Sequence, residues 1–485
     1  MSDAPSAHLN SGLKLWALVL LVAWSALDQA RGSSFTNLFS FGASPTAASS
    51  PQGGLALVGN TLYGTASSGG SNGNGATFAI SINGTNYTNL NNFSVLSAST
   101  NSDGANPDAS LAASGNLLYG TTYNGGLGGS GTIFSLGTNG MDFTNLYSFS
   151  PAINLTNRDG QNPQADLVIA GSTLYGTTGG GGSGGNGTVF RINIDGTGFT
   201  NLHSFTPLIR PLFTNVDGAN PSAGLLLAGG VLYGTTTAGG LGGNGTVFAI
   251  ATNGTSFTNL YNFSPLTSAS TNVDGANPQA ALVCSGTNLF GTAVNGGASG
   301  NGTVFRLGTN GAGFATLHSF SQFNSGNATT DGANPSASLL LVNSALYGTA
   351  LRGGTGASGA IFKLNLDGSG FTSLYNFSSI PSGVSTNSDG ANPSSSLVFS
   401  NNTFYGTAGN GGAYGEGTVF SLRVLDPIPL SFQFLNRALV LTWTNPVFAL
   451  QSATSLLGTY TNVPGAVSPY TNVIGAQRFF RLKGN

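Results

Sequence analysis

The chain has 485 residues, of which only 6% are charged, and its formal net charge at pH 7 is −2. The few scattered Lys and Arg residues exclude a basic surface for nucleic acid, and the single cysteine excludes a disulfide framework. The 76 glycines, together with 10% aromatic residues, favour a turn-rich β protein over a helical or disordered chain.

Residues 1–32 are predicted to be a secretory signal peptide. Lys14 precedes an apolar run, Leu15–Leu27, that is short for a bilayer span and suits a signal-peptide core. Small residues at Ala23 and Ser25, or at Ala26 and Ala30, offer cleavage positions. We therefore expect export to the cell envelope surface or outside the cell, without a membrane span after cleavage. An uncleaved membrane anchor is the alternative.

The rest of the chain is dominated by a repeat. A Leu-Tyr-Gly-Thr tetrapeptide or close variant recurs every 56–58 residues, and a Gly-Thr-Val-Phe-like run follows each copy. Such self-similarity predicts a repeat architecture in which each unit buries its apolar surface against its neighbours. The aromatic residue of the tetrapeptide is Tyr63, Tyr119, Tyr175, Tyr233, Phe290, Tyr347 or Tyr405.

Each unit contains four strand-like runs. In the unit after Pro221 they are Ala223–Leu227, Val231–Thr236, Gly245–Ile250 and Phe257–Phe263, each bounded by Gly, Asn or Pro. Four strands in such a unit match a propeller blade, whereas a parallel β-helix would repeat at a shorter period. The sequence thus predicts an all-β fold, a seven-bladed β-propeller over residues 33–425.

The ends of the array predict how the ring closes. The fourth strand of a unit carries a Phe-Thr-Asn-Leu-like run, which the seventh unit lacks after Phe420. The missing copy lies before the first complete unit, at residues 35–41. We therefore predict that the N-terminal strand completes the last blade, which would remove the exposed sheet edges of a linear array.

Residues 426–485 are predicted to be a small C-terminal all-β module. The run Asp426-Pro427-Ile428-Pro429 is typical of a stiff linker. The strands that we predict in this module are Leu430–Leu435, Ala438–Thr444, Phe448–Ser452, Thr459–Val463 and Gln477–Leu482.

These motifs resemble a known family over about residues 35–422. The order Asp-Gly-Ala-Asn-Pro, Leu-Tyr-Gly-Thr-Thr, glycine-rich loop, Gly-Thr-Val-Phe and Phe-Thr-Asn-Leu is similar to the GloVer tandem repeat of choice-of-anchor bacterial surface proteins. The resemblance implies an exported protein whose carboxyl end holds an interchangeable anchoring or sorting module. It implies no activity and no catalytic set. The run Phe479-Phe480-Arg481-Leu482-Lys483 is not part of a hydrophobic helix of the kind that some members carry, so we expect no anchor of that kind.

The Asp-Gly-x-Asn-Pro turns are candidate calcium sites. Asn precedes most of the aspartates by two residues, and Asn-x-Asp-Gly resembles part of a calcium-binding loop, without its first acid or its later Glu. The favoured alternative is a structural turn, in which Asp caps the turn and Asn-Pro directs the next strand. No other cofactor is expected. The aspartates are Asp103, Asp159, Asp217, Asp274, Asp331 and Asp389.

Loops that join blades, and loops between second and third strands, should emerge on one face and carry a binding site. Charged and aromatic residues that break the repeat lie there. His203 and His318 instead occupy a strand position filled elsewhere by Tyr, and Cys284 is predicted to be a small core residue rather than a nucleophile. The candidate binding residues are Tyr123, Arg158, Arg210, Phe213, Phe323, Arg352, Tyr414 and Glu416.

Two functions remain open. The favoured one is a monomeric, non-enzymatic scaffold that binds an extracellular glycan or a surface protein, or builds envelope structure. The alternative is a polysaccharide-active enzyme, a lyase or a hydrolase, since propellers host many chemistries. A pair of acids about 5–10 Å apart would favour a glycosidase. Glu416 is the only Glu, and acids outside the repeated turns are few, which disfavours the enzyme.

Overall fold

The computed structural model describes residues 33–42, 47–424, 431–435, 438–442, 448–455, 459–473 and 478–484. The predicted signal peptide, residues 1–32, and the whole predicted linker, residues 426–429, lie outside these ranges. The described residues form strands and turns and no α-helix, so the all-β prediction is confirmed for them. Among them there is also no helix long and apolar enough to cross a membrane.

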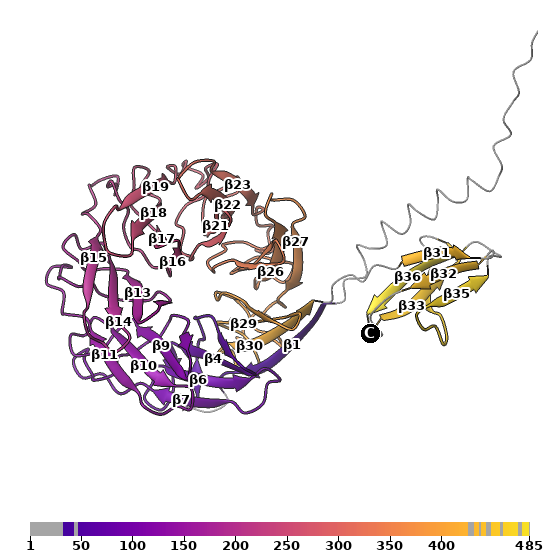
Figure 1. Cartoon of the computed structure of the whole chain (residues 1–485), viewed down its shortest axis with the longest axis horizontal. Helices are drawn as coiled ribbons and strands as arrows, with labels where there is room; N and C mark the ends of the chain where they lie inside the picture. The colour runs from indigo at the N-terminus through magenta and orange to yellow at the C-terminus, as the bar shows by residue number, and fades with distance from the viewer. Residues whose placement is uncertain are drawn as a thin grey trace, which may run out of the picture. The chain divides into compact units, whose positions relative to one another are not determined.

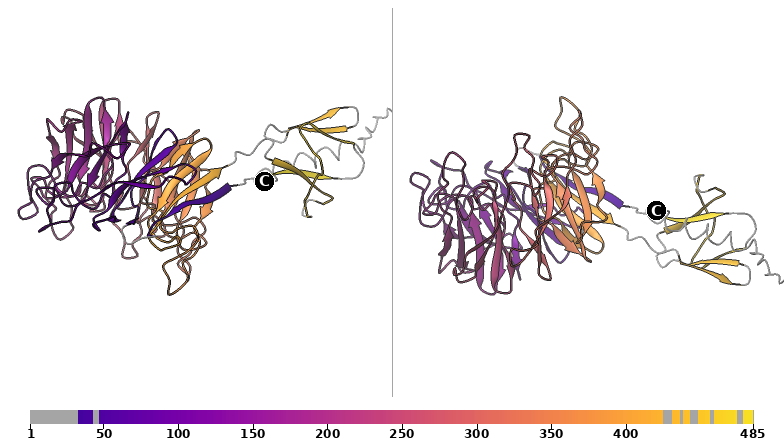
Figure 2. Two further views of the ribbon diagram at one scale, coloured as in Figure 1. Left: turned by 90° about the horizontal axis from the view of Figure 1, so that it is seen from below. Right: turned by 90° about the horizontal axis from the view of Figure 1, so that it is seen from above.

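Seven four-stranded sheets make up the body of the described structure. Figure 1 shows them following one another in chain order around a common centre, and Figure 2 shows the same body edge-on. The first three sheets are β3 (Ala56–Val58), β4 (Thr61–Ala66), β6 (Ala76–Ser81) and β7 (Thr88–Asn92); β8 (Ala112–Ser114), β9 (Leu117–Thr122), β10 (Thr132–Gly137) and β11 (Thr144–Ser148); and β12 (Val168–Ala170), β13 (Thr173–Thr178), β14 (Thr188–Asn193) and β15 (Thr200–Ser204).

The remaining four sheets repeat this arrangement. A separate two-stranded sheet is formed by β2 (Ala48–Ser49) and β5 (Ser68–Gly69). The fourth and fifth sheets are β16 (Leu226–Ala228), β17 (Val231–Thr236), β18 (Thr246–Ala251) and β19 (Thr258–Asn262), then β20 (Val283–Ser285), β21 (Asn288–Ala293), β22 (Thr303–Gly308) and β23 (Ala315–Ser319). The sixth and seventh are β24 (Leu340–Val342), β25 (Ala345–Ala350), β26 (Ala360–Asn365) and β27 (Thr372–Asn376), then β28 (Val398–Ser400), β29 (Thr403–Ala408), β30 (Thr418–Val424) and β1 (Ser33–Ser40).

The glycine of the Leu-Tyr-Gly-Thr motif is required by close packing inside each sheet. In the fourth sheet Gly234 of β17 pairs with Phe248 of β18. A Cβ atom on Gly234 would lie 2.4 Å from Cζ of Phe248, far inside van der Waals contact. The phenylalanine ring of the Gly-Thr-Val-Phe motif therefore packs against the glycine of the Leu-Tyr-Gly-Thr motif. Both motifs are needed for this contact.

The third and fourth strands of six sheets share a β-bulge. In the third sheet Val189 pairs with His203 while the next residue, Phe190, pairs with Asn201, so Leu202 is extra. The same shift falls at the equivalent position of five further sheets. A bulge increases the local twist of a strand pair, which suits the outer part of a propeller blade.

The hydrophobic core lies between neighbouring sheets. One cluster joins Tyr175 and Val189 of the third sheet to Leu232 and Phe248 of the fourth. Another joins Tyr405 and Val419 of the seventh sheet to residues of the first, including Leu62 and Phe78. Both faces of each sheet are therefore buried, which explains why the strands are apolar on both faces.

A threonine in the second strand of each sheet bonds to the following sheet. Thr177 Oγ1 donates a 3.0 Å hydrogen bond to the carbonyl oxygen of Ala223, and Thr349 Oγ1 donates one to Ser395. In the seventh sheet Thr407 Oγ1 donates to the carbonyl oxygen of Gly53, which leads into the first. Similar bonds are donated by Thr65, Thr121, Thr235 and Thr292.

The first strand of each unit is shorter than the sequence predicts. In the fourth unit we predict Ala223–Leu227, and the strand is β16, Leu226–Ala228. The carbonyl oxygen of Ala223 accepts a hydrogen bond from Thr177 of the preceding sheet. The residues before Leu225 therefore contact that sheet and do not pair with the second strand of their own sheet. Cys284 also departs from the prediction: it is half-buried in β20 at the margin of a core cluster.

The described strands after residue 424 form two further sheets. The chain divides into two compact units, and the strands after residue 424 belong to the smaller one. One strand in it, β35, was not predicted, because Tyr470–Val473 follows a Ser-Pro turn without a clear apolar pattern. Its two three-stranded sheets are β31 (Ser431–Leu435), β32 (Ala438–Thr442) and β35 (Tyr470–Val473), and β34 (Thr461–Asn462), β33 (Phe448–Ala453) and β36 (Phe479–Gly484).

Candidate functional site

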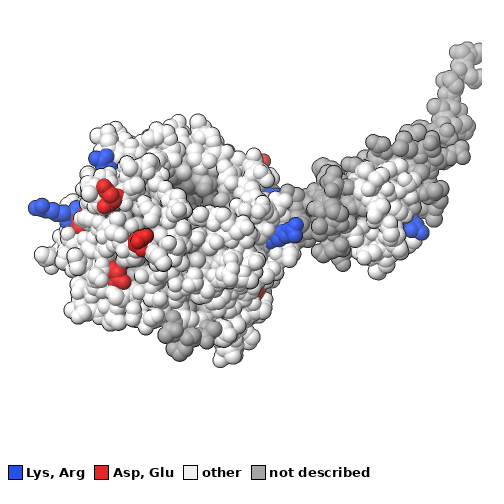
Figure 3. Space-filling model, turned by 60° about the horizontal axis from the view of Figure 1, so that its bottom comes forward, with Lys and Arg blue, Asp and Glu red and all other residues white. Residues whose placement is uncertain are grey.

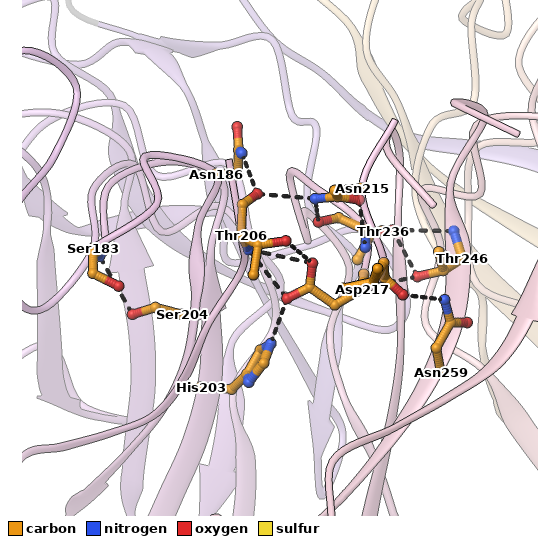
Figure 4. A network of polar contacts seen from close by, with 12 residues as sticks. Ser183, Asn186, His203, Ser204, Thr206, Asn215, Asp217, Thr236, Thr246 and Asn259 are labelled. Atoms are coloured by element: carbon orange, nitrogen blue, oxygen red, sulfur yellow. Dashed lines mark hydrogen bonds and ion pairs between the residues drawn. The ribbon is translucent and has the colours of Figure 1, made fainter. Parts of the chain in front are cut away.

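The repeated aspartates are hydrogen-bond acceptors, and all of them except the half-buried Asp103 are buried. The carboxylate of Asp217 accepts hydrogen bonds from the backbone N–H and the hydroxyl of Thr206 and lies 3.0 Å from Nε2 of His203 (Figure 4). Burial raises the pKa of Asp217, but the hydrogen bonds from His203 and Thr206 outweigh this effect and hold the pKa below its usual range. The carboxylate thus ties the end of β15 to the loop that leads into the fourth sheet.

Tyrosine replaces histidine in the equivalent networks of three other sheets. The hydroxyl of Tyr147 donates to Asp159 at 2.9 Å, and burial together with the charge of Asp159 raises the pKa of Tyr147. His203 stacks on Phe257 with ring centroids 3.8 Å apart, as Tyr147 stacks on Phe199 at 4.1 Å. The prediction that the histidines occupy a structural strand position is confirmed.

The asparagine of each Asn-x-Asp-Gly turn is fully used by the backbone. Asn215 Oδ1 accepts hydrogen bonds from the N–H groups of Gly218 and Gly240, at 2.9 and 2.8 Å. Its Nδ2 donates to the carbonyl oxygens of Thr206 and Gly218. The described residues contain no group of three or more His, Cys, Asp and Glu side chains placed to hold a metal ion. Calcium binding by these turns stays a prediction.

These bonds join two kinds of loop into one surface, which we call the loop face. The segment that leads into each sheet pairs with the loop between that sheet's second and third strands. In the fourth sheet the N–H of Ala219 donates to the carbonyl oxygen of Ala238 and that of Ala238 donates back. The two kinds of loop therefore lie together, as the sequence predicts.

The predicted binding residues are distributed around this loop face. Arg158, Arg210, Arg352 and Glu416 are exposed, while Tyr123 and Phe323 are half-buried. Arg210 and Phe213 are close together: the guanidinium carbon of Arg210 lies 5.4 Å from the ring centroid of Phe213. Figure 3 shows how sparse charged side chains are over one view of the body. Tyr414 and Glu416 share the loop between β29 and β30, and Phe323 and Arg352 lie in the two loops of the sixth sheet. Tyr123 and Arg158 lie in loops of the second and third sheets.

Eight of the exposed large hydrophobic residues lie on the loops of the second, third and fourth sheets, and we call this set the apolar arc. Sequence analysis named only Phe213 of this set, because single aliphatic residues in glycine-rich loops do not stand out. A Cβ on Gly243 would lie 3.0 Å from the carbonyl oxygen of Leu212, so the loops of Leu212 and Leu241 are adjacent. The arc consists of Val95, Leu127, Ile153, Leu155, Ile209, Leu212, Phe213 and Leu241.

A cavity of about 120 Å³ lies where the seven sheets meet. Each sheet contributes three consecutive residues, which directly follow the proline at the end of a loop-face segment. The lining is formed by Gln, Ser, Ala and Gly residues with two aspartates, and it contains no basic or aromatic side chain. The lining ranges are 52–54, 108–110, 164–166, 222–224, 279–281, 336–338 and 394–396.

The two aspartates of the cavity, Asp108 and Asp166, have perturbed acidities. Burial raises the pKa of Asp108 to about 6 against a smaller opposing effect of its hydrogen bond with Ser67. Burial also raises the pKa of Asp166, whose Oδ1 accepts a 2.7 Å hydrogen bond from the backbone N–H of Ser110. Sequence analysis missed both residues. The available signal was that each breaks the repeat just after an Asn-Pro pair.

These features define the class of the protein as a repeat β-propeller. The sequence model of a family described as the Gloeobacter/Verrucomicrobia repeat matches residues 26–210, 88–268, 153–330 and 274–437. The chain belongs to this family, which confirms the resemblance seen in its motifs. No curated protein matches the sequence.

Solved structures of similar fold include several proteins of low identity. A chain of the nidogen–laminin complex is 15% identical with a TM-score of 0.36, and the match covers 56% of this chain and 81% of that one. An oligogalacturonate lyase in complex with manganese is 10% identical with a TM-score of 0.47, covering 82% and 94%. An oligogalacturonate lyase from Vibrio parahaemolyticus is 7% identical with a TM-score of 0.42, covering 81% and 97%.

Proposed function

We propose that this protein is an exported, non-enzymatic scaffold, a closed seven-bladed propeller that binds another surface protein through the apolar arc of its loop face. The observation that carries the proposal is the cluster of exposed Ile209, Leu212, Phe213 and Leu241, at 67, 75, 49 and 71% exposure, on two adjacent loops. Contiguous exposed apolar patches mark interaction sites, whereas isolated ones need no explanation.

Closure of the ring is supported by the contacts of β1. The strand lies at the edge of the seventh sheet beside β30, and the ring of Phe35 stacks on Tyr375 of the sixth sheet at 4.0 Å. On its other side Phe39 stacks on Tyr87 of the first sheet at 3.8 Å. A rigid closed ring would hold the loops in fixed positions, which lowers the entropy lost when they bind a partner.

The chemistry of the arc favours a protein partner over a glycan. Sugars are bound through planar aromatic faces and hydrogen-bonding side chains, and the arc is mainly aliphatic. Aliphatic side chains around an aromatic anchor and an arginine suit the centre of a protein–protein interface. The pair Arg210 and Phe213 supplies that anchor.

The experiment measures binding of the purified protein to isolated envelopes of the producing cells. The substitutions Leu212→Ser, Phe213→Ala and Leu241→Ser together should abolish binding, because they remove the centre of the arc. The control Val384→Ser changes a loop-face residue outside the arc, 54% exposed, and should bind like the parent. Protease treatment of the envelopes should also abolish binding. Binding that survives protease and is lost after periodate oxidation would make the ligand a glycan.

A second function, that of a polysaccharide-active enzyme, is favoured by one observation. The cavity holds two carboxyl groups, and a pKa of about 6 keeps Asp108 partly protonated near neutral pH, as a general acid requires. Release of reducing ends from a panel of polysaccharides, lost on Asp108→Asn, would support this function. Both carboxyls have raised pKa values, however, whereas acid and base roles need them to differ.

A further inference from the structure

The central cavity is an acceptor-rich site with two carboxyl groups, and the loop-face function does not use it. Its charged residues are Asp108 and Asp166, while the other repeats place Gln, Ser, Gly or Ala at the equivalent positions. Three glutamines and several serines add further oxygen atoms. The Oγ of Ser336, also on the lining, is buried without a hydrogen-bond partner.

The two carboxylates have no basic partner in the described part of the chain. The ion pairs found there join His203 to Asp217 and His318 to Asp331, both away from the cavity lining. Asp166 accepts a hydrogen bond from the N–H of Ser110, and Asp108 bonds with Ser67. Two half-buried carboxylates without a counter-charge are costly, so a bound cation would stabilise the site.

We propose that this cavity binds an organic ligand through a primary ammonium group held by the carboxylates of Asp108 and Asp166. An ammonium has three donors and suits the carboxylates together with serine and glutamine oxygens. A site of about 120 Å³ has room for several water-sized groups, which is enough for a short aminoalkyl chain or an amino-sugar ring. Ca²⁺ takes six to eight oxygen ligands, and no third acidic side chain lines the cavity.

The ammonium could come from a free amino sugar or from a lysine side chain of another protein, and the test separates these sources. Calorimetric titrations of the purified protein at pH 7.5 use glucosamine and Nα-acetyl-lysine amide as the two ammonium probes. N-acetylglucosamine is the matched neutral probe. We expect at least one ammonium probe to bind and the neutral probe not to bind.

Substitutions identify the cavity as the site. Asp108→Asn and Asp166→Asn should each weaken binding roughly tenfold or more, because each removes a charged hydrogen-bond acceptor. The control Asp195→Asn removes the same charge from an exposed hairpin turn and should bind like the parent. Binding of Nα-acetyl-lysine amide, whose amine stays protonated over this range, should also weaken from pH 7.5 to pH 5, because Asp108 with a pKa of about 6 gains a proton. The comparison of the two pH values uses only the parent protein, so it does not depend on whether a variant folds.

The proposal is overturned by equal binding of N-acetylglucosamine, by unchanged binding in both cavity variants, or by the absence of binding for both ammonium probes up to about 50 mM. It is also overturned if the parent binds equally at both pH values. The Leu212→Ser, Phe213→Ala, Leu241→Ser protein should still bind the ammonium probe. Failure of the loop-face proposal is therefore distinguishable from failure of this one.

Discussion

Thr407 Oγ1 donates a 3.0 Å hydrogen bond to the carbonyl oxygen of Gly53, although the two residues are 354 positions apart in the chain. The six equivalent threonines donate to residues 44–46 positions further on, in the following unit. The same interaction between neighbouring units is therefore made between the last unit and the first, far apart in the chain. Both the bond and the edge strand β1 depend on the N-terminal segment staying in place.

Deleting residues 34–41 should destabilise the body of sheets by several kcal/mol or cause aggregation, because it exposes the edge of β30 and removes Phe35, Phe39 and Phe41 from contacts with aromatic neighbours. Thermal unfolding followed by circular dichroism measures the effect. A chain truncated after residue 477 loses equally many residues from the other unit and should keep the main transition of the parent. Equal melting of the 34–41 deletion and the parent would disprove ring closure.

Leu225→Ala should lower the free energy of unfolding by roughly 2–5 kcal/mol, because the side chain is buried in the cluster between the third and fourth sheets. Urea denaturation gives the change. Leu127→Ala is the matched control: Leu127 is 77% exposed, so its loss should change stability by less than about 0.5 kcal/mol. Similar changes in the free energy of unfolding for both variants would show that Leu225 does not belong to the hydrophobic core.

Asn215→Ala should destabilise the fourth unit by roughly 2–4 kcal/mol, since it leaves the N–H groups of Gly218 and Gly240 without their acceptor. Asn215→Thr should cost less. Thr329 fills this position in the sixth unit, and its hydroxyl accepts from Gly332 and Gly354. Denaturation of both variants against the parent measures the difference, and a threonine variant as unstable as the alanine one would refute the role given to this oxygen.

Chelation separates the structural role of these turns from calcium binding. If the carboxylates serve only as hydrogen-bond acceptors, EDTA should leave the melting temperature unchanged, because a ligand of the folded state would otherwise raise it. A marked drop in melting temperature with EDTA that calcium reverses would instead establish the predicted calcium sites.

Asp108 should make the protein less stable as pH rises from about 4 to about 6. Its pKa is raised by burial from 3.8 to about 6, so the folded state holds this proton more tightly than the unfolded state. Its stabilising contribution is complete below pH 4 and lost above pH 6. The change is at most about 3 kcal/mol, and less because water in the cavity screens the charge. Asp217, with a lowered pKa, acts in the opposite direction and loses its contribution as pH falls.

Urea denaturation of the parent and Asp108→Asn between pH 4 and pH 7 measures this effect. The parent's stability should fall relative to that of the variant across the interval. A constant difference between the two proteins would show that Asp108 does not titrate differently in the folded and unfolded states.

The period of the repeats determined the all-β architecture, because every unit carries the same strand motifs and can bury them only against a neighbour. The displaced copy at residues 35–41 predicted which sheet β1 would join. Comparison of equivalent positions in the repeats likewise identified His203 and His318 as structural strand residues, because other units have Tyr there. These features are local or repeated, so sequence analysis could find them.

The cavity and the apolar arc were decided by tertiary structure. Asp108 and Asp166 are 58 residues apart and look like isolated substitutions, yet both line one cavity because every unit turns the same lead-in residues toward the common centre. Leu212 and Leu241 become neighbours only when the lead-in loop pairs with the loop between β17 and β18. A repeat sequence specifies the contacts that recur in every unit. Where rare side chains meet depends on how the sheets are arranged around the centre, and this arrangement leaves no periodic signal.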